Sequence, residues 1–267
     1  MNASVMRTAA VEDGDHYVIN GSKIWTSTAK QADMIFCLVR TDPTAKKHEG
    51  ITYITFPMTT PGIEIRPLVD MTGSANFNEV FFTDVRVPKS GVIYAANKGW
   101  QVANATLTHE RGMLGDPNAT KARFLELVTL MKTETVNGEP LISNPHLRDR
   151  LMKLQSEVYA MQANGLRITT SRLKNEPAGI AGLIVKLQGC DLNHEIARLA
   201  IDALGEFGIL YEEGEHLRAD GSWQWRYMYD LGLIIGGGTA QIQKNIIAER
   251  GLGLPREPKA ARSRRDD

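Results

Sequence analysis

Three short stretches of the sequence combine residue types that could do chemistry. The first is Thr-His-Glu-Arg at residues 108–111, inside a run whose apolar residues repeat at a helical spacing. Glu110 follows Trp100 by ten residues, which rotates its side chain by about 80° from that of Trp100, to the border of the buried face. A carboxylate at such a border has a raised pKa and can act as a general base. The alternative is a solvated Glu–Arg pair, which periodicity alone favours.

The second stretch is Gly-Gly-Gly-Thr at residues 236–239, which leads into a predicted helix. Glycines leave backbone N–H groups free and let a ligand approach closely, and the start of a helix favours anions. A flexible interhelical loop explains the glycines equally well. The glycine spacing differs from that of a dinucleotide-binding fingerprint, and no strand–helix–strand unit surrounds it.

The third stretch is Trp25, Thr26 and Ser27 at the end of a predicted strand. A tryptophan and two hydroxyl groups can stack on a flat heterocycle and hydrogen-bond to it. The alternative is a tryptophan that fills the core, and the three residues taken alone favour this alternative.

Other common chemistries lack a pattern in this sequence. The six histidines form no i, i+4 pair and no cluster with cysteine, so we expect no metal site. The sequence also contains no nucleophile elbow and no phosphate-binding P-loop.

The composition is that of a globular protein of 267 residues, 42% hydrophobic and 23% charged. Lys and Arg together number 31, as do Asp and Glu, so we expect no nucleic-acid partner. No run approaches the ~20 apolar residues of a membrane span, and the N-terminus does not resemble a signal peptide. Two cysteines, Cys37 and Cys190, make no disulfide framework, which favours a reducing cytoplasm.

The elements that must position these residues fall into two classes. Residues 1–93 are rich in β-prone residues, and strands are expected at 33–40, 50–56, 62–67 and 79–87. The pair Asn20-Gly21 between two β-prone runs predicts a hairpin turn. Short strands at this spacing indicate an antiparallel sandwich or barrel.

Residues 94–254 change to a helical period and predict a bundle. Long helices are expected at 121–133, 145–175, 179–204 and 231–250. Asp116 before Pro117 predicts a helix start with Asp116 as its N-cap. The charged residues 255–267 are expected to be an unfolded tail. The predicted class is therefore α+β, with a partial β domain followed by a helical domain.

Taken in order, several segments resemble the acyl-CoA dehydrogenase family. The matching segments are residues 14–25, 80–88, 99–100, 203–208 and 238–250. The resemblance covers nearly the whole chain, and its Gly-Thr-x-Gln-Ile-Gln element is specific. It implies a β-sandwich-like middle domain followed by a four-helix domain. It also implies bound FAD and the conversion of an acyl-CoA to its 2-enoyl-CoA.

The resemblance assigns roles residue by residue. Trp25 and Ser27, with Thr26 between them, match the residues that pack on and bond to the flavin ring. Thr239 and Gln241 match FAD contacts at the start of the last long helix. Arg111 matches an arginine near the CoA moiety.

The catalytic base is the informative case. Many family members carry it just before the Gly-Thr of the C-terminal loop, where this sequence has Gly237. Other members carry it on the first C-terminal helix, at the position of Glu110. The resemblance therefore makes Glu110 the leading candidate for the base that removes the α-proton while the β-hydrogen leaves as hydride.

Two departures from the family bear on its partners. The sequence starts where the family's middle domain is already under way, so we expect another chain to cover the exposed apolar surface. An Arg-x-x-Phe-Gly stretch that reaches a neighbouring subunit's FAD is missing near residues 136–142. The resemblance implies an electron-transfer flavoprotein or similar acceptor and a homo- or hetero-oligomer with acyl-CoA dehydrogenase chains, and the two departures favour a split or heteromeric enzyme. The alternative is a non-catalytic assembly subunit or a decayed fragment.

Overall fold

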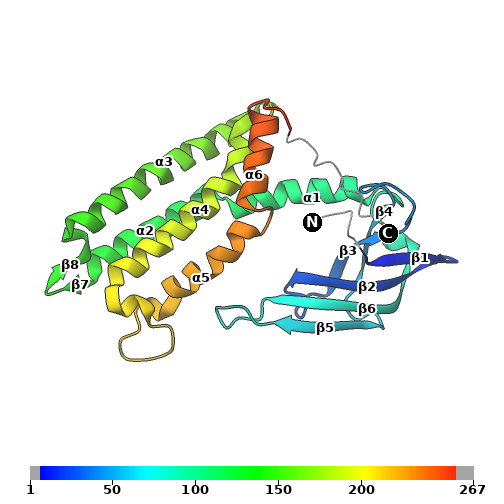
Figure 1. Ribbon diagram of the computed structural model, residues 1–267, viewed down its shortest axis with the longest axis horizontal. Helices are drawn as coiled ribbons and strands as arrows, with labels where there is room; N and C mark the ends of the chain where they lie inside the picture. Colours follow the sequence, from blue (N-terminus) through cyan, green and yellow to red (C-terminus); the bar gives the residue numbers. More distant parts are fainter. Residues whose placement is uncertain (1–6, 257–267) are drawn as a thin grey trace, which may run out of the picture. The chain divides into compact units, whose positions relative to one another are not determined.

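The computed structural model describes residues 7–256, except for the side chains of residues 108–112. The chain divides into two compact units, residues 1–110 and 111–267. The first contains a β-sheet and most of one helix, and the second is helical (Figure 1). This order of elements confirms the predicted α+β class.

The first unit contains a six-stranded sheet in the order β4-β3-β1-β2-β6-β5 (Figure 1). Its strands are β1 (Ala9–Asp13), β2 (His16–Ser27), β3 (Met34–Arg40), β4 (Ile51–Pro57), β5 (Ile63–Leu68) and β6 (Phe77–Pro88). Neighbouring strands pair antiparallel, except that β1 and β3 meet in parallel at Ala9 and Arg40. The four predicted strands are present, each within about two residues of its expected ends.

The core of the sheet follows the two-residue period of its strands. Along β6, Val80, Phe82, Val85 and Val87 are buried, while most residues between them face outward. The ring of Phe82 meets that of Phe56 from β4 edge to face, with centroids 6.0 Å apart. Branched and aromatic side chains on one face therefore supply the apolar burial that stabilises the sheet.

The hairpin predicted at Asn20-Gly21 is wrong. The turn between β1 and β2 lies at Gly14 and Asp15, and Asn20 and Gly21 lie inside β2. The pairing of β2 with β6 shifts register between Ile19 and Gly21, which marks a bulge. The side chain of Asn20 accepts a hydrogen bond from the backbone N–H of Asp84 on β6 and donates one to its carboxylate. The Asn20-Gly21 pair therefore forms a bulge in a continuous strand paired with β6, and not a turn.

The helical elements begin within the first unit and continue through the second. The helices are α1 (Gly99–Leu114), α2 (Pro117–Thr133), α3 (Pro145–Leu173), α4 (Gly179–Leu204), α5 (Ser222–Ile235) and α6 (Ala240–Ile246). A short hairpin of β7 (Thr135–Val136) and β8 (Glu139–Pro140) joins α2 to α3. Short turns are η2 (Lys89–Gly91), η3 (Leu141–Ser143), η4 (Gly205–Ile209), η5 (Ala219–Gly221) and the π-type η6 (Ile247–Gly251).

Two predictions about helix ends have opposite outcomes. Asp116 is the N-cap of α2, and its carboxylate accepts a hydrogen bond from the backbone N–H of Asn118, which confirms the prediction. The single helix expected at 231–250 is wrong. Three glycines divide this segment into the end of α5 and the whole of α6. Of these glycines, Gly237 and Gly238 have φ of 63° and 100°. A positive φ is incompatible with a continuing α-helix, and glycine reaches it without a steric penalty.

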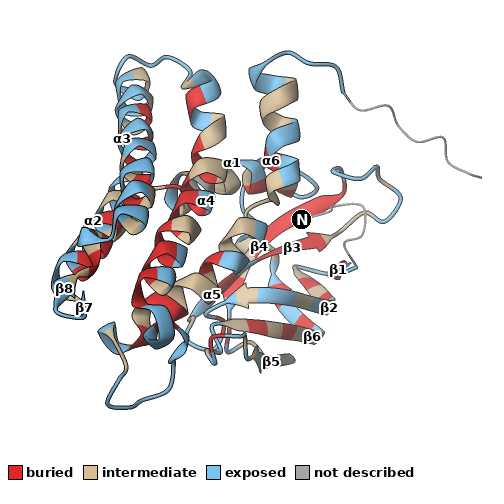
Figure 2. Cartoon of the chain, turned by 60° about the vertical axis from the view of Figure 1, so that its left-hand side comes forward, coloured by how far each residue is buried: buried red, intermediate tan, exposed pale blue. Residues whose placement is uncertain are grey.

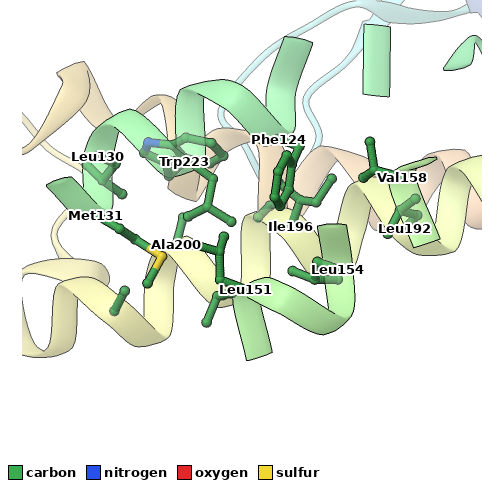
Figure 3. Close-up of a cluster of buried hydrophobic side chains, with 14 of the residues drawn as sticks. Phe124, Leu130, Met131, Leu151, Leu154, Val158, Leu192, Ile196, Ala200 and Trp223 are labelled. Carbon is green, nitrogen blue, oxygen red and sulfur yellow. The ribbon is translucent and has the colours of Figure 1, made fainter. Parts of the chain in front are cut away.

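The core of the helical unit lies where α4 packs against α2, α3 and α5. Phe124 of α2, Leu151 of α3, Ile196 of α4 and Trp223 of α5 meet there (Figure 3). Half of the residues of α4 are buried among the other helices, whereas α3 has a long exposed side (Figure 2).

One buried ion pair joins α2 to α5. Asp230 is 1% exposed, and its Oδ2 accepts a hydrogen bond from Nη1 of Arg123 at 2.5 Å. Burial raises the pKa of Asp230, and the Arg123 guanidinium opposes that rise. The pair fixes the lateral position of α5, because separating the two groups would leave a buried charge without a partner.

No helix in the described part of the chain is long and apolar enough to cross a membrane. The predicted unfolded tail falls almost entirely on residues 257–267, outside the described residues.

The bulge in β2 yields a stability prediction. A Cβ on Gly21, whose φ is 135°, would lie 2.7 Å from the Cα of Thr8, whereas a Cβ on Gly14, whose φ is 61°, would meet nothing within 4 Å. We expect Gly21→Ala to lower the free energy of unfolding by about 2–4 kcal/mol, through a backbone clash and strain. Gly14→Ala adds only backbone strain and is expected to lower the free energy of unfolding by about 1–2 kcal/mol.

Urea denaturation of both variants measures these free energies. Equal losses in the two variants would contradict the close approach of β2 to Thr8.

Candidate functional site

The end of β2 presents an exposed tryptophan. Trp25 is 64% exposed and has a φ of 63°, within a second register shift between β2 and β6. Its ring meets that of Phe77 edge to face, with centroids 6.0 Å apart. The alternative in which Trp25 fills the core is therefore wrong. An unfavourable backbone conformation that displays a large aromatic face to solvent is a common feature of ligand sites.

Two hydroxyl groups follow Trp25 on the same strand. The backbone carbonyl of Thr26 accepts a hydrogen bond from Nδ2 of Asn78 at 3.1 Å, and that of Ser27 accepts one from Oγ1 of Thr28 at 2.8 Å. These bonds hold the end of the strand in place, but they involve the backbone carbonyls of Thr26 and Ser27 and not their hydroxyl groups. Neither hydroxyl bonds to another described residue. An exposed aromatic ring can thus stack on a flat heterocycle while a nearby hydroxyl bonds to its edge; since successive side chains of a strand point to opposite faces, the two hydroxyls lie on opposite sides of β2.

The glycine loop is a second candidate site, and it lies in the helical unit. α5 ends at Ile235, and the N–H of its C-cap residue Gly236 donates to the carbonyl of Gly232 at 2.8 Å. The chain then passes through Gly237 and Gly238 at positive φ and enters α6. Thr239 is the N-cap of α6, and its hydroxyl accepts a long hydrogen bond of 3.4 Å from the N–H of Ile242. Glycine is required here because two consecutive residues adopt the left-handed region.

The loop conformation bears on the position of the base. A Cβ on Gly237 would lie 2.6 Å from Cδ1 of Leu114, and its φ of 63° adds strain to any side chain. A carboxylate at 237 would therefore need the side chain of Leu114 to move. Gly237 has no titratable side chain, and its surroundings leave no room for one without that movement.

The sequence analysis missed two residues that hold this loop. Lys186 of α4 is 2% exposed, and its Nζ donates to the carbonyls of Ile234 and Gly238. Gln243 of α6 is also 2% exposed, and its Nε2 donates to the carbonyl of Gly237 at 3.0 Å. A lone lysine within an apolar helical run was the available signal for Lys186. Gln243 belongs to the Gln-Ile-Gln motif, in which only Gln241 had been singled out.

The structure places the remaining predicted site residues as follows. Thr239 is partly exposed and Gln241 is exposed, two residues apart at the start of α6. Glu110 and Arg111 lie on α1, but their side chains lie outside the described residues. Trp25, Thr26 and Ser27 are consecutive on β2 in the first unit, and Thr239 and Gln241 are together in the second. The roles of all seven residues stay predictions.

Metal chemistry has no support in the part of the chain with described side chains, because no group of three or more His, Cys, Asp or Glu residues is arranged to hold an ion.

Comparison with known proteins identifies the architecture. Residues 1–85 match the acyl-CoA dehydrogenase middle domain, and residues 97–252 match the acyl-CoA dehydrogenase C-terminal domain. The chain belongs to the acyl-CoA dehydrogenase family. It is 39% identical over 259 residues to acyl-CoA dehydrogenase IpdE1 of Mycobacterium tuberculosis, covering 96% of this chain and 64% of that protein. The chain thus spans just under two thirds of the length of that relative.

Solved structures of acyl-CoA dehydrogenases share this fold. The Tcur3481-Tcur3483 steroid ACAD aligns with a TM-score of 0.86 and 30% identity, over 96% of this chain and 65% of that chain. The ChsE4-ChsE5 complex from Mycobacterium tuberculosis aligns with a TM-score of 0.84 and 30% identity, over 95% of this chain and 66% of that chain.

The acyl-CoA dehydrogenase family is FAD-dependent. The residues of this chain fit a flavin in kind, because the exposed ring of Trp25 can stack on an isoalloxazine ring and a hydroxyl group near it can hydrogen-bond to the edge of that ring.

The strained tryptophan yields a prediction about stability. We expect Trp25→Gly to change the free energy of unfolding of the ligand-free protein by less than about 1 kcal/mol, because relief of the positive φ offsets the lost contact with Phe77. Ile19→Ala, a fully buried site on the same strand, is expected to cost about 2–5 kcal/mol. Chemical denaturation measures both changes. A loss in Trp25→Gly as large as that in Ile19→Ala would show that Trp25 is structural.

Proposed function

We propose that this chain takes part in the FAD-dependent α,β-dehydrogenation of an acyl-CoA thioester, in fatty-acid or steroid side-chain catabolism. The observation that carries the proposal is the exposed Trp25 with its two unused hydroxyls, in a chain of the acyl-CoA dehydrogenase family. The IpdE1 relative and the steroid ACAD structure support a substrate in this range. We also propose domain boundaries at 1–93, 94–254 and 255–267.

The proposed roles follow the chemistry of each residue. Bound FAD supplies the acceptor for the hydride that leaves the β-carbon. Glu110 takes the α-proton, and Arg111 binds near the CoA moiety. Trp25 packs against the flavin ring, and Thr26 and Ser27 hydrogen-bond to it. The reaction requires a general base on one side of the substrate and the flavin ring on the other.

Thr239 and Gln241 are proposed to contact FAD from the start of α6. The exposed side chain of Gln241 and the partly exposed side chain of Thr239 support this role. The loop that precedes them contains no side chain between Ile235 and Thr239, which permits close approach of a ligand to the backbone.

We further propose that the chain works in an oligomer with a second acyl-CoA dehydrogenase-type chain and passes electrons to an electron-transfer flavoprotein or similar acceptor. The ChsE4-ChsE5 structure, a complex of two such chains, supports the first partner. We place the enzyme in a reducing, cytoplasmic compartment, which the two free buried cysteines support. Burial raises the pKa of Cys37 to about 11, so this cysteine remains a thiol.

The exposed side of α3 supports association with another chain. Its residues form a row with alternating spacings of four and three, which we call the α3 seam: Met152, Ser156, Tyr159, Ala163, Leu166, Thr170 and Leu173. All seven are exposed, including Leu166 at 70% and Leu173 at 81%. This spacing is that of a coiled-coil contact, and alternating large and small side chains let a second helix approach closely. The 29 residues of α3 make a contact surface about 43 Å long.

The test of the dehydrogenase function uses the chain co-expressed with the acyl-CoA dehydrogenase-type chains encoded beside it. We expect a yellow protein that reduces an electron acceptor in the presence of an acyl-CoA. Glu110→Gln is expected to lower kcat by about 10²–10⁴-fold and to keep the flavin spectrum, because only the base is lost. The control is Glu139→Gln, an exposed carboxylate on the β7–β8 hairpin.

Full activity in Glu110→Gln would assign the base to another residue. A colourless protein in every combination would support the alternative of a non-catalytic assembly subunit.

The α3 seam has a separate test. We expect Leu166→Lys to reduce the amount of partner chain that co-purifies by more than tenfold, because a charge in the centre of an apolar helix contact has to be desolvated. Leu125→Lys, at an exposed leucine on α2, is the matched control and is expected to leave the complex intact. Light scattering of the purified complexes gives their mass. An unchanged complex in Leu166→Lys would place the interface elsewhere.

A further inference from the structure

Lys186 is a buried cation whose hydrogen-bond partners are two backbone carbonyls. Its Nζ lies 2.9 Å from the carbonyl oxygen of Ile234 and 2.8 Å from that of Gly238. No carboxylate in the described part of the chain forms an ion pair with it. Burying an ammonium group is costly unless its protons are bonded, so these two carbonyls account for its position.

The location of the first carbonyl explains why a cation is tolerated there. Ile234 lies in the last turn of α5, which ends at Ile235. The final carbonyls of a helix lack intrahelical donors and form the negative end of its dipole. Lys186 therefore satisfies a free carbonyl of α5 and holds the beginning of the glycine loop to α4.

The second carbonyl belongs to the loop itself, and Gln243 holds the carbonyl beside it. Gln243 donates to the carbonyl of Gly237, and Lys186 donates to that of Gly238. Both donors are 2% exposed, so both carbonyls turn toward the interior of the helical unit. The two peptide planes are thus fixed from two different helices, α4 and α6.

The orientation of these carbonyls determines the orientation of two N–H groups. The described chain has no cis peptide bond, and in a planar trans peptide the N–H points opposite to the C=O. The N–H of Gly238 therefore points away from Gln243, and the N–H of Thr239 points away from Lys186. No described residue accepts a hydrogen bond from either group.

We infer that Lys186, with Gln243, is a positioning residue that presents the backbone N–H groups of Gly238 and Thr239 as paired donors to a bound ligand. The inference rests on the proposed function for the identity of that ligand, the FAD cofactor. Its acceptor atoms would be oxygen or ring nitrogen, the groups that backbone amides bind. Glycine gives the loop its freedom, and the lysine removes that freedom in the folded protein.

The test separates loop order from cofactor binding. Lys186→Met removes both hydrogen bonds that Nζ donates and keeps an apolar side chain in the buried space. We expect ¹⁵N order parameters of Gly237 and Gly238 in the ligand-free chain to fall from about 0.85 to below about 0.6. We expect the dissociation constant for FAD, measured on the co-expressed protein, to rise at least tenfold.

The matched control is Val158→Ala, which opens a cavity in the core of the helical unit away from the loop. It is expected to lower overall stability while leaving the loop order parameters and FAD affinity unchanged. Gln243→Leu frees only the carbonyl of Gly237 and is expected to give intermediate order parameters. This second variant keeps the inference testable if Lys186→Met does not fold.

The outcomes distinguish this inference from the proposed function. A disordered loop in Lys186→Met, together with no FAD binding by the unsubstituted protein, would support the positioning role and contradict the cofactor. Unchanged loop order and FAD affinity in Lys186→Met would overturn the positioning role, whether or not the enzyme is active. Unchanged loop order in Gln243→Leu would exclude Gln243 from the pair.

Discussion

The ammonium group of Lys186 is the constraint on which the geometry of the glycine loop depends. α4 is enclosed by α2, α3 and α5, so a lysine on its inner face has no access to water. The charge is stabilised only where free carbonyls converge, at the end of α5 and in the loop that follows it. The buried ion pair between Arg123 and Asp230 holds α5 one turn before Ile234. The packing of the helical core and the position of the glycine loop therefore depend on the same interactions.

In the sheet unit, the candidate ligand-binding residue departs from the packing pattern that stabilises the core. Its core uses alternating apolar side chains, and most of its strand residues obey that pattern. Trp25 departs from it, because a large aromatic side chain is exposed on a residue with positive φ. Both features cost free energy in the ligand-free protein, and a stacked heterocycle would offset the exposure. Local departures from good folding rules are expected where a ligand binds.

Two of the three Asn-Gly pairs in the chain show what a local signal can predict. Asn137-Gly138 forms the hairpin turn between β7 and β8, with φ of 53° and 81°. Asn20-Gly21 has the same composition and lies inside β2, where only the glycine has positive φ. The difference is tertiary, since β6 pairs along the whole of β2 and the side chain of Asn20 bonds to Asp84 on that strand. Turn propensity is a difference of a few kcal/mol, and a long strand pairing exceeds it.

The sequence by itself determined the α+β class, the positions of the main strands and helices, and the N-cap at Asp116. These follow from periodicity and backbone chemistry, which act between residues close in the chain. It also singled out Trp25 and the glycine loop by residue type. The exposure of Trp25, the separation of α5 from α6 by the glycines, and the hold of Lys186 and Gln243 on the loop carbonyls could not be predicted from the sequence. Those outcomes depend on burial and on contacts between distant segments, because the cost of an unpaired charge or carbonyl is set by the surroundings that folding creates.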